Sequence, residues 1–199
     1  MAETAPYPGT VEWSGENPGI SLKADPAGPF TTLASFFRVI LSPHGRGHAL
    51  MLARAPGVAG PQNLVLTDNE PLARWLVANY LRHFAAWKNL PALDGLRYVK
   101  ADQVSSSGDP ASSYSETVRG ADLNVALTWS GLGEPFCFTH SPENSATGVH
   151  WMPSLFIGCA DASITVNGER LPGHPVPRVV AGRPISTAML AFAETWLRG

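Results

Sequence analysis

Two glutamates stand in strand-like runs that are otherwise rich in apolar residues, and they are the residues best suited to proton chemistry. Glu116, in YSETV, shares a strand face with Tyr114, and Glu194, in LAFAETW, shares one with Phe192 and Trp196 if both segments are regular strands. If those faces point inward, loss of solvent raises the pKa of each carboxyl and prepares a general acid or base. The alternative is that both carboxylates face water and carry no chemistry.

Two histidines stand at either side of residues 141–148, which have the composition of a loop. His140 ends one strand-like run and His150 begins the next, so pairing of these strands would bring the two imidazoles together. Imidazoles suit proton transfer near neutral pH or metal ligation. Because no compact metal-ligand motif accompanies them, we expect no metal and no cofactor, and each histidine could simply be a strand-end residue. The candidate catalytic residues are therefore Glu116, Glu194, His140 and His150.

Aromatic side chains near these four residues could line a pocket for a small molecule. A pocket of this kind has mostly apolar walls and a few polar groups that orient the ligand. The chain has six tryptophans and eight phenylalanines, which fit an ordinary core almost as well. The candidate ligand-binding residues are Tyr114, Trp129, Phe136, Phe138 and Trp151.

The common catalytic and cofactor signatures are missing from the sequence. We find no G-x-S-x-G, H-E-x-x-H, G-x-G-x-x-G or phosphate-loop pattern, and Cys137 and Cys159 do not form a C-x-x-C pair. With 14 Lys and Arg against 16 Asp and Glu, the formal net charge is −2, which argues against nucleic acid as a partner. No secretory signal or run of about 18 apolar residues is recognisable, so we expect a cytoplasmic protein that is not in a membrane.

The elements that would position these residues are mostly short strands. Alternation is clearest over residues 122–129, and Asn167-Gly168 predicts a tight hairpin because both positions of a type I′ turn need positive φ. Residues 104–113 have the composition of an exposed loop. Residues 185–198 fit a helix by composition and a strand by alternation, and we favour a strand because no helix cap precedes them.

One long amphipathic helix is predicted near residues 69–88. Cap-type and acidic residues precede Pro71, and large apolar residues then recur at helical spacing as far as Trp87. The predicted fold is mainly β, an antiparallel barrel or two-sheet sandwich with this helix against one end or face. Residues 1–30 are expected to be an extended arm rich in Pro and Gly, and residues 31–199 a single strand-rich domain.

Three classes of function remain open at this point. The first is a β-barrel or sandwich that binds a small, mostly apolar molecule. The second is a cofactor-independent enzyme of the isomerase, cyclase or hydratase type that uses the same pocket for acid and base catalysis. The third is a structural or interaction module whose apolar surface pairs with another chain, for example in a homodimer.

Overall fold

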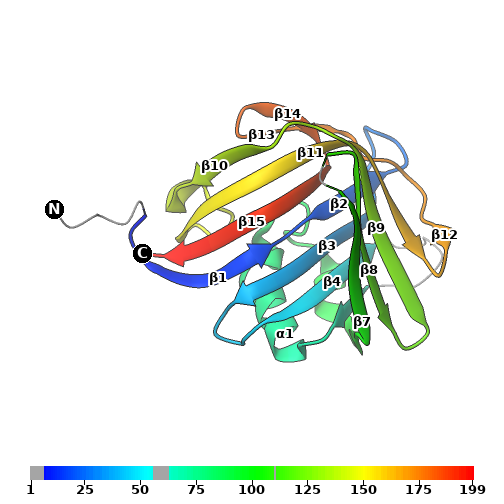
Figure 1. The fold of residues 1–199 in the computed structure, drawn as a ribbon, viewed down its shortest axis with the longest axis horizontal. Coiled ribbons are helices and arrows are strands. Elements are labelled where there is room, and N and C mark those ends of the chain that lie inside the picture. The colour runs from blue at the N-terminus through cyan, green and yellow to red at the C-terminus, as the bar shows by residue number, and fades with distance from the viewer. Residues whose placement is uncertain (1–6, 56–62, 110) are drawn as a thin grey trace.

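The computed structural model describes residues 7–55, 63–109 and 111–199. Strands make up 59% of the fold and helical residues 11%, and the main sheet folds over into two layers without closing into a barrel (Figure 1). The mainly β, sandwich-like prediction is thereby confirmed. The elements in chain order are β1 (Thr10–Glu16), β2 (Gly19–Lys23), β3 (Phe30–Leu41), β4 (Gly47–Arg54), β5 (Leu64–Thr67), α1 (Glu70–Asn79), η1 (Leu81–His83), η2 (Pro91–Gly95), β6 (Arg97–Lys100), β7 (Gln103–Asp109), β8 (Ser113–Gly120), β9 (Leu123–Leu132), β10 (Phe136–His140), η3 (Pro142–Asn144), β11 (His150–Val166), β12 (Glu169–Arg170), β13 (Pro177–Val180), β14 (Arg183–Ser186) and β15 (Ala188–Arg198).

The long strand β11 joins the two layers. The first layer contains β1 to β6, β10, β15 and the first part of β11, and the second contains β7, β8, β9, β12 and the second part of β11. Its first part pairs with β15 as far as Gly158, and its second part pairs with β9 from Cys159 onward. The order of the strands is β6-β5-β4-β3-β1-β15-β11-β9-β8-β7, with β2, β10 and β12 attached beside it. At the crossing point Gly158 lies so close to Ile185 that an added Cβ would stand 2.6 Å from its Cγ2 atom. A glycine therefore permits the close packing at this point.

Two apolar cores lie on opposite faces of the first layer. The core between the layers includes Phe36, Leu127 and Trp129, which are fully buried. The second core packs the first layer against α1 and the segment after it, and includes Trp13, Leu76 and Trp196. Alternation along β9 follows the predicted pattern, with every second side chain buried.

The predicted helix begins where expected and ends earlier. Asn69 caps α1 by accepting a hydrogen bond from the Leu72 backbone N–H at 3.2 Å. The helix stops at Asn79, and Tyr80 leaves helical geometry with φ −128°. Its ring packs edge-on against Trp196 and its hydroxyl donates to Glu12, so tertiary contacts outweigh the continuing helical periodicity. Residues 84–89 form turns and bends instead of helix.

Much of the segment predicted as an extended arm belongs to the sheet. Strand β1 lies between β3 and β15, and β2 pairs with both as well. Trp13 is fully buried in the second core. The Pro and Gly residues thus punctuate two short strands that the sheet requires, and residues 1–6 lie outside the described part of the chain.

The last strand, β15, contains a bulge that exchanges its two faces. Residues 185–198 were predicted as a strand, and β15 confirms this over Ala188–Arg198. The pairing with β11 shifts register between Ala193 and Ala191. As a result Phe192 packs against the core between the layers, whereas Glu194 and Trp196 lie on the opposite face. The single face predicted for Phe192, Glu194 and Trp196 was wrong for this reason.

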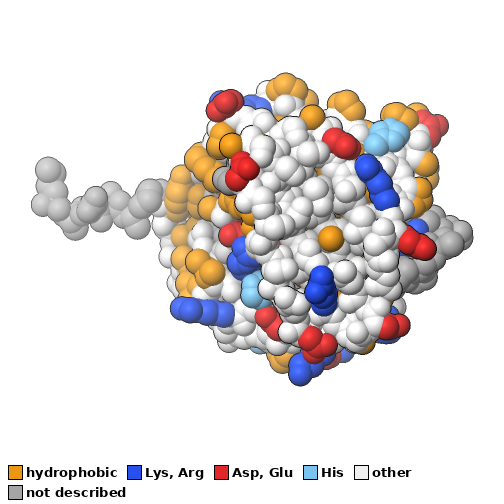
Figure 2. Space-filling view, turned by 45° about the vertical axis from the view of Figure 1, so that its right-hand side comes forward, with side chains coloured by type: hydrophobic (Ala, Val, Ile, Leu, Met, Phe, Trp, Pro, Cys, Tyr) orange, Lys and Arg blue, Asp and Glu red, His pale blue; other side chains and the backbone are white. Residues whose placement is uncertain are grey.

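The Asn167-Gly168 turn is present between β11 and β12, with both residues at positive φ. Across the described ranges, none of the helices has the length and apolar character that crossing a bilayer demands. Figure 2 shows the molecule with the β7–β9 side brought forward, and acidic and basic side chains are interspersed on this face. Neither charge gathers into a large patch in this view.

Candidate functional site

Glu194 is a carboxyl group buried on the helix-facing side of β15. Its side chain is 3% exposed, and the bulge in β15 is what turns it to this face. Trp196 Nε1 donates a hydrogen bond to Glu194 Oε1 at 2.6 Å. Burial raises the pKa of Glu194 to about 7, although hydrogen bonds from Trp196 and Asn17 oppose the shift. A carboxyl with this pKa exists in both protonation states near neutral pH, as an acid or base catalyst must.

Glu194 lines a cavity of about 590 Å³ that we call the Glu194 cavity. Side chains from β15, β2, β10 and β11 meet here with two segments outside the main sheet, residues 83–88 and 178–181. The walls are largely aromatic or thioether groups, with polar groups at intervals. The large apolar residues are Phe84, Trp87, Phe138, Met152, Phe156, Met189 and Trp196, and the polar ones include Asn17, His83, Lys88, His140, Arg178 and Thr187.

His140 is the second candidate catalytic residue in this cavity. Strands β10 and β11 do pair, but His140 stands opposite Met152, which also lines the cavity, and not opposite His150. Its ring packs edge-on against Phe138 with centroids 5.0 Å apart. Burial lowers the pKa of His140, so its imidazole is neutral at neutral pH. A neutral imidazole can accept a proton at one ring nitrogen and donate a hydrogen bond from the other.

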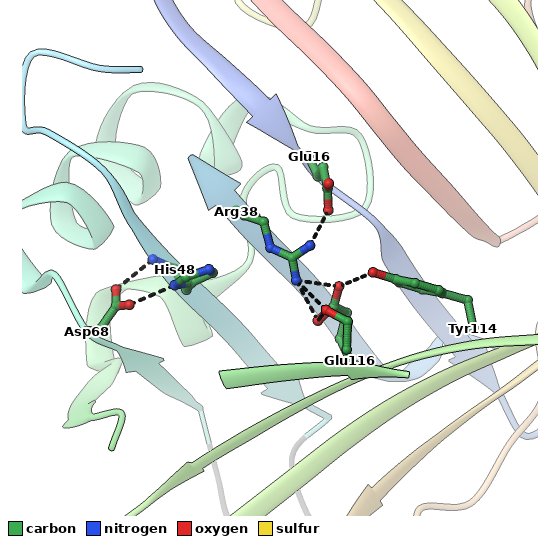
Figure 3. A network of polar contacts seen from close by, with 7 residues as sticks. Glu16, Arg38, His48, Asp68, Tyr114 and Glu116 are labelled. Carbon is green, nitrogen blue, oxygen red and sulfur yellow. Dashed lines mark hydrogen bonds and ion pairs between the residues drawn. The ribbon is translucent and has the colours of Figure 1, made fainter. Parts of the chain in front are cut away.

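Glu116 lies in a different place, in an ion-pair network at one side of the core between the layers (Figure 3). Arg38 Nη2 donates to both of its carboxylate oxygens, at 2.8 and 2.9 Å. The Tyr114 hydroxyl donates at 2.8 Å and the Ser106 hydroxyl at 2.9 Å. Burial alone would lower the pKa of Arg38, but the negative charges of Glu116 and Glu16 and the contact with Tyr114 together outweigh it and raise that pKa. The charge of Glu116 is therefore balanced by Arg38, and both of its oxygens accept hydrogen bonds. This arrangement suits a structural role better than proton transfer.

The same view shows two further polar contacts in this region. Arg38 Nη1 also donates to Glu16 at 2.9 Å, and beside it His48 Nδ1 lies 2.7 Å from Asp68 Oδ2 (Figure 3). The contacts of Arg38 on β3 with Glu16 on β1 and Glu116 on β8 join strands of the two layers. The network thus fixes how the two layers meet.

His150 forms a third cluster with residues from both ends of the chain. Its Nε2 lies 2.9 Å from Glu12 Oε2, and its Nδ1 lies 2.6 Å from the Thr147 hydroxyl. Glu12 also accepts from the Tyr80 hydroxyl at 2.5 Å and from Arg198. Burial raises the pKa of Glu12, but these hydrogen bonds outweigh it and lower the pKa to about 2. An ionised Glu12 can only accept, so Nε2 of His150 carries the proton and Nδ1 accepts from Thr147.

Hydroxyl, imidazole and carboxylate follow one another here in the order of a nucleophilic triad. None of the three side chains lines the Glu194 cavity, however, and Glu12 is also engaged by Tyr80 and Arg198. This cluster is best explained as a partly buried polar connection between β1, β11 and β15.

The predicted ligand-binding residues are distributed over several parts of the molecule. Phe138 lines the Glu194 cavity, and Phe136 packs beside it in a small cluster with Phe156. Trp129 is fully buried in the core between the layers, where its Nε1 donates to the Gly19 carbonyl. Tyr114 belongs to the Glu116 network, and Trp151 packs against Tyr7. The structure therefore brings Glu194, His140 and Phe138 to one cavity and leaves the other candidates elsewhere.

Asn17 and Arg178 are among the polar residues of the cavity that sequence reasoning missed. Asn17 is 4% exposed and accepts a hydrogen bond from the Ser35 hydroxyl at 2.7 Å. It was overlooked because residues 1–30 were expected to lie outside the sheet. Arg178 stands within the apolar run PVPRVV, and a charged residue in such a run could have marked it. Over residues 7–55, 63–109 and 111–199, no group of three or more His, Cys, Asp or Glu side chains could hold a metal ion.

No known protein-family model matches the chain, and no curated protein sequence matches it significantly. Functional arguments for this protein therefore rest on the geometry of the Glu194 cavity.

Proposed function

We propose that this protein binds a small, mostly apolar organic molecule in the Glu194 cavity. The observation that carries the proposal is the meeting of a nearly fully buried carboxyl group with Asn17 and His140 inside an aromatic-lined space of about 590 Å³. Apolar walls supply the driving force for binding, and the few polar groups fix the ligand's orientation. A buried carboxyl is costly to maintain, so its presence in a cavity favours a functional role.

A neutral fluorescent probe tests the binding function directly. We expect 1-anilinonaphthalene, whose emission rises in apolar surroundings, to show saturable binding at a single site. Ala85→Trp would extend a large ring from the cavity wall and abolish this binding, since Ala85 lines the cavity and is itself exposed. Ala27→Trp is the matched control, because Ala27 is an exposed residue of a distant turn. Absence of saturable binding, or equal loss in both variants, would refute the proposal.

Acid and base catalysis in the same cavity is the second candidate function. The pKa of about 7 at Glu194 favours it, because such a carboxyl can both take and return a proton near neutral pH. We propose Glu194 as the acid or base and His140 as its partner in a cofactor-independent proton transfer, as in an isomerase, cyclase or hydratase. The third class, an interaction module, has less support because exposed large apolar residues fall on separate segments, namely Val11, Ile40 and Leu41, Val149 and Val179.

Deuterium incorporation distinguishes catalysis from binding alone. The small molecule that co-purifies with the protein would be released, identified by mass and returned to the apoprotein in heavy water. Catalysis predicts deuterium at a carbon of this molecule with the wild-type protein and a loss of at least a hundredfold in rate with Glu194→Gln. Binding alone predicts no incorporation with either protein.

A further inference from the structure

Arg178 lines the Glu194 cavity, and among the described residues no carboxylate lies within ion-pair distance of it. It lies on β13, in the hairpin formed by β13 and β14. Within the described part of the chain, its Nε atom is shielded from solvent and has no hydrogen-bond partner. Its Nη2 atom lies 3.0 Å from Met189 Sδ, a weak and uncharged acceptor. Burial, with no opposing acid, lowers the pKa of Arg178.

Arg38, Arg198 and Arg74 show what Arg178 lacks, whereas Arg54, which does not line the cavity, also has buried nitrogens without a partner among the described residues. Arg38 pairs with Glu116 and Glu16, and Arg198 pairs with Glu12. Even Arg74, on the exposed side of α1, pairs with Glu70 at 2.7 Å. An unpaired guanidinium with a shielded nitrogen is costly, because it loses water without gaining a charged partner. Such a group at a cavity wall is explained if a ligand supplies the anion.

The charges around the cavity fit an anion as well. Lys88 and Arg178 are the cationic side chains of its lining, and Glu194 is the carboxyl there among the described residues. Glu194 is not within ion-pair distance of Arg178, and burial favours its neutral form. Neutral Glu194 can donate a hydrogen bond, and His140 and His83 can do so too. The site therefore offers net positive charge and several donors.

We propose that the ligand of the Glu194 cavity is an apolar molecule bearing one carboxylate, which pairs with Arg178. This inference rests on the binding function proposed above and names the class of molecule. The planar guanidinium donates two parallel hydrogen bonds to a carboxylate, a geometry that no thioether can match. Met189 has a flexible side chain, so the carboxylate can displace Sδ from Nη2 and also reach Nε. The apolar body then lies against the aromatic walls formed by Phe84, Phe138 and Trp196.

A matched pair of ligands tests the charge requirement in the wild-type protein. Naphthalene-2-acetate and naphthalene-2-acetamide have nearly the same shape and differ in charge. Each would be titrated against bound 1-anilinonaphthalene at neutral pH. We expect the acid to displace the probe at a concentration at least tenfold lower than the amide. If the probe binds and the acid and amide compete equally, the inference is overturned while the binding function stands. If the probe itself does not bind, both fail.

Variants at Arg178 locate the charge requirement. Arg178→Met is expected to reduce the tenfold preference for the acid to twofold or less. The preference is a ratio of two competitors measured against the same probe in the same variant, so a change in probe affinity cancels from it. Arg178→Lys retains the positive charge but lacks the paired N–H donors of the guanidinium, and it should keep an intermediate preference for the acid over the amide. Arg183→Met, on β14, is the control because Arg183 is exposed and outside this cavity. A preference that survives Arg178→Met, or that is lost equally in Arg183→Met, contradicts the assignment. The wild-type comparison remains decisive if Arg178→Met fails to fold.

Discussion

Glu194 combines nearly complete burial with a position at the cavity wall, and its protonation should be visible in the stability of the protein. Its pKa in the folded state, about 7, lies above the 4.5 of an exposed glutamate. The folded state therefore binds the proton more tightly, and the stability associated with this group is lost as pH rises from about 4.5 through about 7.

The first prediction follows from this loss of stability with rising pH. Glu194→Gln is expected to be more stable than the wild type by roughly 2 to 3 kcal/mol at about pH 8, and the difference should vanish below about pH 4. Urea unfolding at several pH values measures it. Glu169→Gln, at an exposed position of β12, serves as the control. A difference that does not change with pH would show that Glu194 titrates normally.

The second prediction concerns the buried partner of Arg38. Arg38→Met leaves the fully buried Glu116 without its cation, which should cost about 3 kcal/mol of unfolding free energy. The double variant Arg38→Met/Glu116→Gln should recover part of that loss because the uncompensated charge is gone. Arg74→Met breaks an exposed pair and should cost less than about 1 kcal/mol. If the double variant is no better than Arg38→Met, the loss comes from packing instead of charge.

Among the elements, β11 has the most demanding geometry because it passes from one layer to the other at Gly158. The third prediction is that Gly158→Ala destabilises the protein by about 1 to 3 kcal/mol, since its Cβ would stand 2.6 Å from Ile185 Cγ2. Gly133→Ala is the control, because its Cβ would meet nothing closer than 3.5 Å. Thermal unfolding compares the two, and Ile185→Ala should partly rescue Gly158→Ala. Equal effects of both alanines would indicate a general backbone cost.

Local patterns account for the elements that the sequence predicted well. Alternation over residues 122–129, the Asn167-Gly168 turn and the cap at Asn69 each depend on neighbours along the chain. The predictions were wrong where contacts between residues far apart in the sequence determine the local structure. The bulge in β15 depends on pairing with β11, the early end of α1 depends on contacts of Tyr80, and the serine-rich residues expected as a loop form β7 because β8 pairs with them. The cavity could be predicted only as far as Glu194, His140 and Phe138.

For the molecule as a whole, two carboxyl groups respond to pH in opposite directions. Glu12 has its pKa lowered to about 2 by hydrogen bonds from Arg198, Tyr80 and His150, which outweigh burial. Its contribution to stability is present above about pH 4.5 and is lost as pH falls toward 2. Glu194 instead favours mildly acidic solution. Together the two groups predict that stability declines on both sides of a mildly acidic range.

The fourth prediction tests the acid side. Glu12→Gln should lower the unfolding free energy at about pH 6, and the difference from the wild type should shrink when unfolding is measured near pH 3. The reason is that Glu12 is protonated in both states at sufficiently low pH and then holds its three donors less strongly. A difference that stays constant between these pH values would mean that charge at Glu12 is not responsible.

The pairing of β1 with β15 has a consequence for synthesis of the protein. The hydrogen bond between the Ser14 and Thr195 hydroxyls, at 2.8 Å, joins residues from the first and last strands. Asn17 and Glu194 come from the same two regions, so the cavity cannot form on the ribosome until β15 has emerged. Until then the exposed edge of β1 can pair with other chains. Pairing of β1 with β15 is also slow, because the two strands are far apart in the sequence. Nascent chains that stall before β15 should therefore depend on chaperones and lack the Glu194 cavity.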